Sequence, residues 1–365
     1  MHETSFAPVK ILAFYDNKRG AWWNCFHNMQ KKFSPDIQFD YIGIYTDFNP
    51  NSYDFFMVLE EYLLPFIAFL PAEKIISGCN CPLLFEPAHR AHKEGRYRAA
   101  IYNCEEMYQK AQDMMPLVFY GPSGVDTELF SPAVLLPKKL TACWVGNSKS
   151  IGQKGLDLIK QACAEAAVPL RYLDSAEQQR PMTHEEIRDE YYRKSSVYIC
   201  ASATEGTPNP ALEALACGLP VITTRVGNMP ELIVEGHNGM FVERSVASIT
   251  EALNTMKTVD IALLSKNARE SVVNGWTWKD QTKRYEDAFK AIAASTNSVS
   301  VQRISSNSYR TFLLQTALQS FLRGDVSTAW QSFSWAVKYT ALWRGLRDLK
   351  NKLAALQQAY LLPRK

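Results

Sequence analysis

Short apolar runs alternate with segments of helical periodicity along most of this chain. Runs such as Val9–Tyr15 and Val197–Ala201 have the length and the β-branched residues of buried strands, and helix-like segments separate them. This alternation is typical of βαβ units, in which helices cover both faces of a parallel sheet. The chain is therefore expected to be an α/β protein built from doubly wound, Rossmann-like domains.

A segment rich in proline and glycine, between Gly121 and Lys138, divides the alternation into two series. The 365 residues exceed one ordinary core and suit two domains. We expect an N-terminal domain over residues 1–135, a second domain over 136–294, and a linker with a helical tail over 295–365. The expected strands are 9–15, 74–77, 99–102 and 117–120 in the first domain, and 140–145, 170–173, 197–201, 220–223 and 240–242 in the second.

Composition excludes several classes of protein. Hydrophobic residues make up 47% of the chain and charged residues 21%, which is typical of a folded globular protein and not of a disordered one. The longest apolar stretch, 62–72, contains two prolines and is about half as long as a bilayer-spanning helix of roughly 20 residues. The polar start 1–10 lacks the layout of a secretory signal, and the eight dispersed cysteines show no disulfide or metal-ligand spacing. We expect a cytoplasmic protein with reduced cysteines.

The last 65 residues differ in charge from the rest. Residues 301–365 hold ten Lys and Arg but only two Asp, and apolar residues recur there at helical spacing. One interpretation is that this basic segment makes a peripheral contact with a polyanion or with the anionic inner face of the membrane. The other is a helical layer packed on the body, or a homodimer interface.

The stretch 197–231, VYICASATEGTPNPALEALACGLPVITTRVGNMPE, carries the strongest chemical signal. A buried strand is followed by a loop, and we expect a helix that starts with Thr207 as cap and Pro208 at its first position and ends at Gly218. A helix amino terminus at the carboxyl end of a parallel strand favours an anionic group. The sequence therefore predicts a phosphate site here.

Charged residues flank this predicted site. Glu205 and Glu213 lie eight positions apart, and such carboxylates either satisfy backbone donors near the helix start or accept hydrogen bonds from ligand hydroxyls. Lys154, in the turn Gly152–Gly155 after the first strand of the same domain, is placed to direct its ammonium toward the phosphate.

Together these motifs resemble one family. The EGTPNPALE string, with seven residues between its two acids, the following ACGLPVITT, GN and PE, and GVDTELFSP at 124–132 resemble the family 4 retaining glycosyltransferases. The resemblance covers residues 117–294 well and the first hundred residues in outline. It implies a GT-B fold, in which two Rossmann-like domains face a cleft.

The resemblance also implies roles for individual residues. Glu213 is expected to hold the ribose hydroxyls, Glu205 to lie near the donor sugar, and Lys154 to stabilise the departing diphosphate. The family's arginine after the first donor-domain strand is missing here, and whether Lys149 substitutes for it is left open. The remaining expected donor-binding residues are Gly146, Asn147, Gly206, Thr207, Pro208 and Asn209.

In the first domain the resemblance is weaker. Gly20 and Trp22 occupy the loop after the first strand, where family members place a glycine-rich turn near the acceptor. Some members carry a histidine near the reacting carbon, for which His89 is a candidate on the acceptor side. The alternative is a histidine on a helix face or loop with no role in the reaction.

The implied reaction transfers a sugar from a nucleotide-sugar to an unidentified glycan, lipid-linked or protein acceptor, with retention of anomeric configuration. No DxD-type acidic pair follows a strand, so no metal and no other cofactor is expected. No specific nucleic-acid partner is expected either. The alternatives are a nucleotide-sugar epimerase or sugar phosphorylase on the same fold, or a non-catalytic nucleotide-sugar-binding scaffold.

Overall fold

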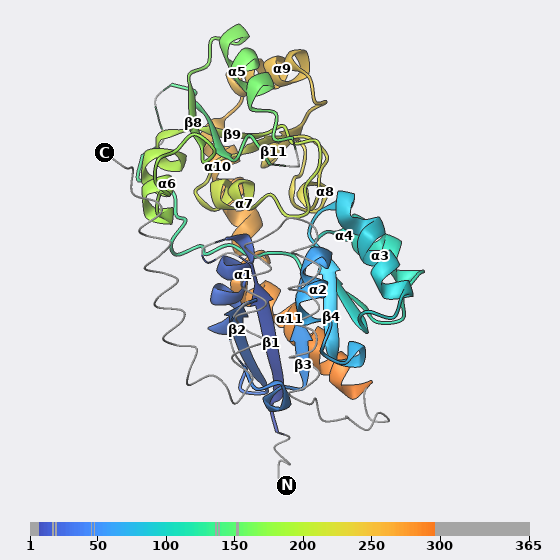
Figure 1. The fold of residues 1–365 in the computed structure, drawn as a ribbon. Helices are drawn as coiled ribbons and strands as arrows, with labels where there is room; N and C mark the ends of the chain where they lie inside the picture. The colour runs from blue at the N-terminus through green and yellow to red at the C-terminus, as the bar shows by residue number, and fades with distance from the viewer. Residues whose placement is uncertain are drawn as a thin grey trace, which may run out of the picture.

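The computed structural model describes residues 7–295, except for positions 17, 19, 45, 47, 136, 138, 151 and 152. Within this range the chain forms two parallel β-sheets, each belonging to a separate domain (Figure 1). The two-domain α/β organisation predicted from the sequence is therefore present. The predicted linker and helical tail, 295–365, lies outside the described residues beyond residue 295.

The first sheet has six strands in the order β2-β1-β3-β4-β5-β6, all parallel. The sequence did not indicate two of them: β2 has a polar residue at every second or third position, and β3 has only three residues. The strands are β1 Val9–Tyr15, β2 Ile37–Gly43, β3 Phe55–Met57, β4 Ile75–Cys79, β5 Ala99–Tyr102 and β6 Val118–Tyr120.

Helices cover both faces of this sheet because successive strand residues point to opposite sides. Leu12 and Phe14 of β1 pack into one apolar cluster with the helices after β3, β4 and β5, while Ile11 and Ala13 pack into a second cluster with the helix after β1. The helices of the N-terminal domain are α1 Ala21–Gln30, α2 Leu64–Ile67, α3 Phe85–Lys93 and α4 Glu105–Gln112.

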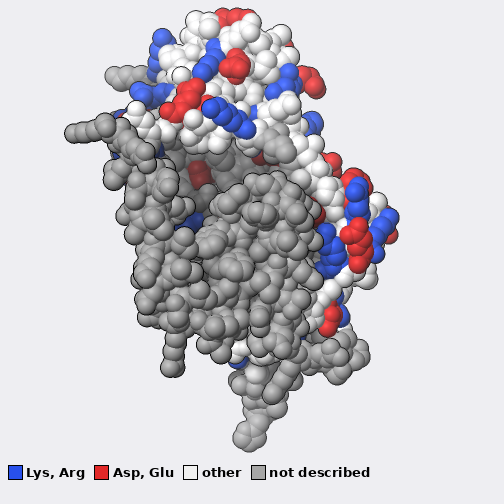
Figure 2. Space-filling view, viewed as in Figure 1, with Lys and Arg blue, Asp and Glu red and all other residues white. Residues whose placement is uncertain are grey.

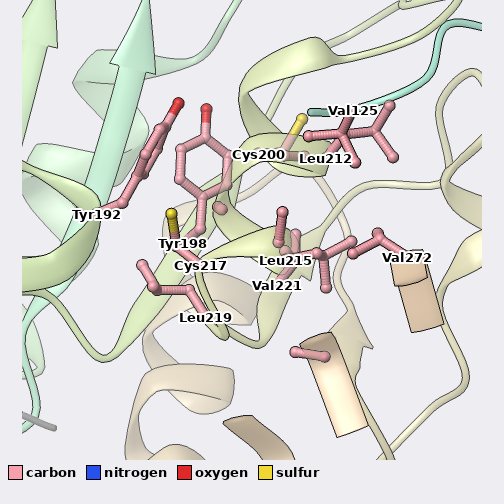
Figure 3. Packing of buried hydrophobic residues seen from close by; sticks show 14 of the residues in the cluster. Val125, Tyr192, Tyr198, Cys200, Leu212, Leu215, Cys217, Leu219, Val221 and Val272 are labelled. Carbon is pink, nitrogen blue, oxygen red and sulfur yellow. The ribbon is translucent and has the colours of Figure 1, made fainter. Parts of the chain in front are cut away.

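The second sheet has five parallel strands in the order β11-β10-β9-β7-β8. They are β7 Ala142–Gly146, β8 Leu170–Asp174, β9 Val197–Cys200, β10 Val221–Thr223 and β11 Gly239–Phe241. Its helices are α5 Leu156–Glu165, α6 His184–Glu190, α7 Asn209–Ala216, α8 Met229–Leu232, α9 Val246–Met256 and α10 Ile261–Val273. On one face, Tyr192 and Tyr198 pack beside Leu212 and Leu215 of α7 (Figure 3).

The last described helix, α11 Trp278–Ala294, departs from the predicted division of the chain. Its position in the sequence placed it with the second domain, but Tyr285, Phe289 and Ile292 are buried in the core of the first sheet. The Tyr285 hydroxyl also donates to the Gly121 carbonyl over 2.6 Å. Helical periodicity predicts an apolar face but does not say which sheet that face covers, so this crossing was not foreseen.

Both sheets reverse their strand order at an interior position. In the first sheet the order reverses between β1 and β3, and in the second between β7 and β9. Ligands of open α/β sheets bind at such switch points, outside the carboxyl ends of the strands. The loops after β1, β3, β7 and β9 are therefore the places to look for functional side chains.

None of the helices that the structure describes combines the length and hydropathy of a bilayer-spanning segment. On the face shown in Figure 2, acidic and basic side chains are interspersed over the described surface. All eight cysteines are free thiols, and seven of them are buried.

Candidate active site

A cavity of about 540 Å³ lies between the two domains, at the carboxyl ends of both sheets. Its lining comes from segments that follow β1, β3, β4, β5 and β6 on one side, and from β7, β9 and the segments that follow them on the other. The first domain contributes Ala21, Trp22, Cys25, Glu60, Tyr62, Asn80, Cys81, Leu84, Asn103 and Ser123. The second contributes Trp144, Val145, Gly146, Ser150, Lys154, Tyr198, Cys200, Ser202, Thr204, Glu205, Gly206, Thr207, Pro208, Asn209 and Pro210.

Lys154 and Glu205 meet in this cavity, although 51 residues separate them. The Lys154 ammonium donates to Glu205 Oε1 over 2.5 Å, and the Ser202 hydroxyl donates to the same oxygen over 2.7 Å. The two side chains of the ion pair are 21% and 12% exposed. An ammonium has three donors, so Lys154 can hold Glu205 and still bind oxygen atoms of a ligand.

The backbone explains why the two loops lie so close. Gly155 adopts a φ of +71°, and a Cβ on it would lie 2.4 Å from the Ala201 carbonyl oxygen. Only glycine tolerates both the left-handed conformation and this approach. The loop carrying Lys154 therefore packs directly on the loop that follows β9.

Gly206 brings the donor-side loop against the other domain. A Cβ at this position would lie 1.8 Å from the Asn80 carbonyl oxygen, which belongs to the loop after β4. Beside it, the Thr207 hydroxyl donates to the Asn103 carbonyl over 3.3 Å. The two domains thus touch at one edge of the cavity.

The helix after this loop starts later than predicted. α7 begins at Asn209 with Pro208 as its N-cap, and Thr207 does not cap it, because its hydroxyl is engaged by Asn103 and Asn228. Pro208 and Pro210 lack an amide proton, and the Asn209 amide donates to the Thr207 carbonyl over 2.9 Å. Any contribution of backbone amides to anion binding therefore falls to the Gly206 and Thr207 loop and not to the first turn of α7.

Glu213 lies in the second turn of α7 and is not among the cavity-lining residues. Its Oε2 accepts a hydrogen bond from the Tyr192 hydroxyl over 2.7 Å. Burial raises the pKa of the Glu213 carboxyl to about 7, and the hydrogen bond from Tyr192 opposes that rise. Its predicted role toward ribose stays a prediction.

The remaining predicted donor-side residues lie at the end of β7 and in the turn that follows it, and they differ in whether they line the cavity. Gly146 lines the cavity. Asn147 and Lys149 are exposed and do not line it, and the Asn147 side chain accepts from the Lys149 amide over 3.0 Å. The substitution of Lys149 for the missing arginine therefore gains no support from its position.

On the acceptor side, Trp22 is the predicted residue that reaches the cavity. Gly20 caps α1 with an ordinary extended backbone and is not part of the lining. His89 is buried on α3, where its ring stacks on Phe85, and it also lies outside the lining. The structure thus brings Trp22, but not Gly20 or His89, to the wall of the cavity.

Sequence reasoning missed several polar residues of this site, among them Glu60, Asn103 and Ser202. Each of these three directly follows an apolar run, 55–59, 99–102 or 197–201, and so lies at the carboxyl end of a parallel strand. That position is the signal that identifies them. Among the residues described here, no group of three or more His, Cys, Asp or Glu is arranged to hold a metal ion.

The sequence around this site is similar to known glycosyltransferases. The sequence pattern described as glycosyl transferases group 1 matches residues 172–258, which include β9, the Glu205 loop and α7. A phosphatidylinositol N-acetylglucosaminyltransferase component from Arabidopsis thaliana is 23% identical over 216 residues, covering 51% of this chain and 47% of that protein. The gpi3 component of the same-named enzyme from Schizosaccharomyces pombe is 27% identical, covering 36% and 29%. The chain therefore aligns with less than half the length of either relative.

Solved structures agree with the fold. Sucrose-phosphate synthase from Thermosynechococcus elongatus superposes with a TM-score of 0.63 at 14% identity, covering 79% of this chain and all of that one. Anabaena HepE, solved with UDP and glucose, superposes with a TM-score of 0.56 at 14% identity, covering 80% and 100%. The solved structures confirm the GT-B fold that the sequence predicted. The resemblance to glycosyltransferases is confirmed by the sequence matches, over the segment that they cover.

Proposed function

We propose that this chain is a glycosyltransferase that transfers a sugar from a nucleotide-sugar donor to an acceptor hydroxyl. The family match of its donor-side segment and its fold support this proposal. The proposal includes retention of anomeric configuration and independence from metal ions. The observation that carries it is the Lys154–Glu205 pair, which lies at the β7/β9 switch point in a cavity shared by both domains.

The geometry suits the charge changes of such a reaction. Cleavage of a sugar–phosphate bond builds positive charge on the sugar ring and negative charge on the departing diphosphate. Lys154 supplies a fixed cation for the diphosphate, and the amides of the Gly206 and Thr207 loop lie beside it. Glu205 holds the ammonium in place and adds a carboxylate on the side where the sugar is expected.

Closure of the cavity completes the proposed mechanism. The contact of Gly206 with Asn80, and of Thr207 with Asn103, joins the donor-side loop to the acceptor-side domain. Contact between the domains limits the access of water, which favours transfer over hydrolysis of the donor.

The test is a transfer assay with UDP-, GDP- and ADP-sugars, with products analysed in the presence and absence of acceptor. We expect Lys154→Ala and Glu205→Gln to lower turnover by about 10²–10³, as for loss of one charge-stabilising group, while Lys279→Ala on the exposed start of α11 leaves it unchanged. Acceptor-independent rearrangement or phosphorolysis of the donor would favour an epimerase or a phosphorylase. Full biological activity of both site variants would favour a scaffold.

Two further assays test the finer statements. Proton NMR of the anomeric signal in the first product formed distinguishes retention from inversion. Activity after dialysis against EDTA, compared with activity after re-addition of Mg²⁺ or Mn²⁺, tests metal independence: equal rates support it, and a loss restored by metal contradicts it.

The partners and location remain part of the proposal. Two relatives carry the name of an enzyme that acts on phosphatidylinositol, which favours a lipid-linked acceptor and peripheral contact with the cytoplasmic face of a membrane. Sedimentation of the full chain with vesicles containing anionic lipid tests this. Binding at low salt that fades at high salt supports the contact, and no binding at low salt contradicts it.

A further inference from the structure

Glu60 is a buried carboxyl in the wall of the cavity that the mechanism above does not use. It follows β3 by three residues and is 4% exposed. It lies at the β1/β3 switch point of the first sheet, opposite the switch point that carries Lys154. Its place in the N-terminal domain is therefore equivalent to that of the donor site in the other domain.

The two oxygens of Glu60 differ in their surroundings. Oε1 accepts a hydrogen bond from the indole nitrogen of Trp22 over 3.2 Å. Oε2 is buried and has no hydrogen-bond partner among the described residues. A buried carboxyl oxygen without a partner costs free energy, because it has lost its hydration without replacement. Glu60 lines the cavity, so a group bound there is the candidate to supply the missing hydrogen bond.

We infer that Glu60 binds the acceptor: its Oε2 forms a hydrogen bond with a hydroxyl group of an uncharged sugar or cyclitol ring, and Trp22 fixes the orientation of the carboxyl. This inference rests on the proposed function, since it names the acceptor class of the same cavity. It assigns Trp22 a positioning role and gives the first-domain wall a residue that selects the acceptor.

Electrostatics explains the preference for an uncharged ring. Burial raises the pKa of Glu60 to about 7; the hydrogen bond from Trp22 opposes the rise, and the nearby carboxylates Asp16 and Glu61 add to it. Near neutral pH the group is thus partly ionised, and an anionic acceptor group beside it is repelled. Tyr62 and Cys79 also interact with Glu60, and neither is a cation.

The first experiment observes the site without requiring turnover. The chain is labelled with nitrogen-15 tryptophan, and the Trp22 indole signal is identified by its loss in Trp22→Phe. Methyl α-D-glucopyranoside and myo-inositol serve as uncharged probes, and glucose 6-phosphate as the anionic one. We expect both uncharged probes to shift the Trp22 signal, and glucose 6-phosphate to do so at least tenfold more weakly at pH 8.

Variants separate binding from structure. In Glu60→Ala, the probes are expected no longer to shift the signals of other cavity-lining residues. Glu60→Gln keeps a hydrogen-bonding group, so the probes should still shift these signals, but the shift should no longer depend on pH. Glu61→Gln is the matched control for probe binding: the neighbouring carboxylate pairs with Arg96 and does not line the cavity, and it acts on Glu60 only through its contribution to the raised pKa. In transfer assays, Glu60→Ala should raise the acceptor KM at least tenfold and leave the donor KM unchanged.

The outcomes distinguish this inference from the proposed function. If no uncharged probe moves the Trp22 signal in the wild-type chain, the inference is overturned, even where a nucleotide-sugar binds. If the probes move the signal but no nucleotide-sugar binds, binding of a hydroxylated ring at Glu60 stands, but the proposed function fails and with it the acceptor role of that site. An unchanged acceptor KM in a folded Glu60→Ala variant also overturns the inference.

Discussion

The close approach of the two domains at Gly206 leads to a specific prediction. In Gly206→Ala the new Cβ would lie 1.8 Å from the Asn80 carbonyl oxygen and 2.4 Å from Asn103 Oδ1, whereas real Cβ contacts stay above 3.0 Å. The loop and the facing domain must therefore separate by about 1 Å. A displacement of that size in a catalytic site costs on the order of 10² in rate, or about 2.7 kcal/mol in the transition state.

Because the clash lies between domains, we expect it to displace them and not to unfold either one. The rate of transfer is measured as kcat/KM, and the free energy of unfolding by urea titration. Gly43→Ala is the matched control, since its Cβ would meet only ordinary contacts at 3.5 Å or more. A Gly206→Ala variant that transfers sugar as fast as Gly43→Ala would refute the reasoning, because the domain contact would then play no part in turnover.

Other predictions concern pH and packing. Burial raises the pKa of Glu213 to about 7 from an ordinary value of 4.5, so the folded chain keeps a proton that the unfolded chain releases earlier. The free energy of unfolding should therefore fall as the pH rises from about 4.5 to 7, and Glu213→Gln should flatten that fall in urea titrations at pH 5 and pH 8. An equal slope in variant and wild type would contradict the assignment. Phe289→Ala should lower the free energy of unfolding by about 3–5 kcal/mol, because Phe289 is fully buried against the first sheet. Lys283→Ala, on the exposed side of α11, is the control and should change it by less than about 0.5 kcal/mol. Near-equal losses in the two variants would argue against the packing of α11.

The sequence predicted the order of elements well because strands buried on both faces are continuous apolar runs. Val9–Tyr15 and Ala99–Tyr102 form strands with the predicted bounds. It missed β2 and β3, since the first is partly polar and the second is very short. It also misplaced α11, because pairing between a helix and a distant sheet depends on tertiary packing that local periodicity does not encode.

For the candidate site, sequence motifs were informative where chemistry depends on local spacing. Glu205, Lys154 and the Gly206 loop do meet in one cavity, as their positions after neighbouring strands suggested. Glu60 was missed because its significance depends on what packs around it: a Glu-Glu pair after an apolar run has no distinctive motif. Only the structure shows that one of those two carboxyls is buried beside Trp22, while the other is partly exposed and pairs with Arg96.

The affinity for nucleoside diphosphates tests the central claim most directly. Calorimetric titration of UDP, GDP and ADP should show binding of at least one of them to the wild-type chain and to Lys279→Ala. In Lys154→Ala the affinity for that ligand should fall by about 10- to 100-fold, which corresponds to the loss of one charge-assisted hydrogen bond of about 1.5–3 kcal/mol. Equal affinity in wild type and Lys154→Ala, or no binding of any of the three, would contradict the assignment of this cavity to a nucleotide-sugar.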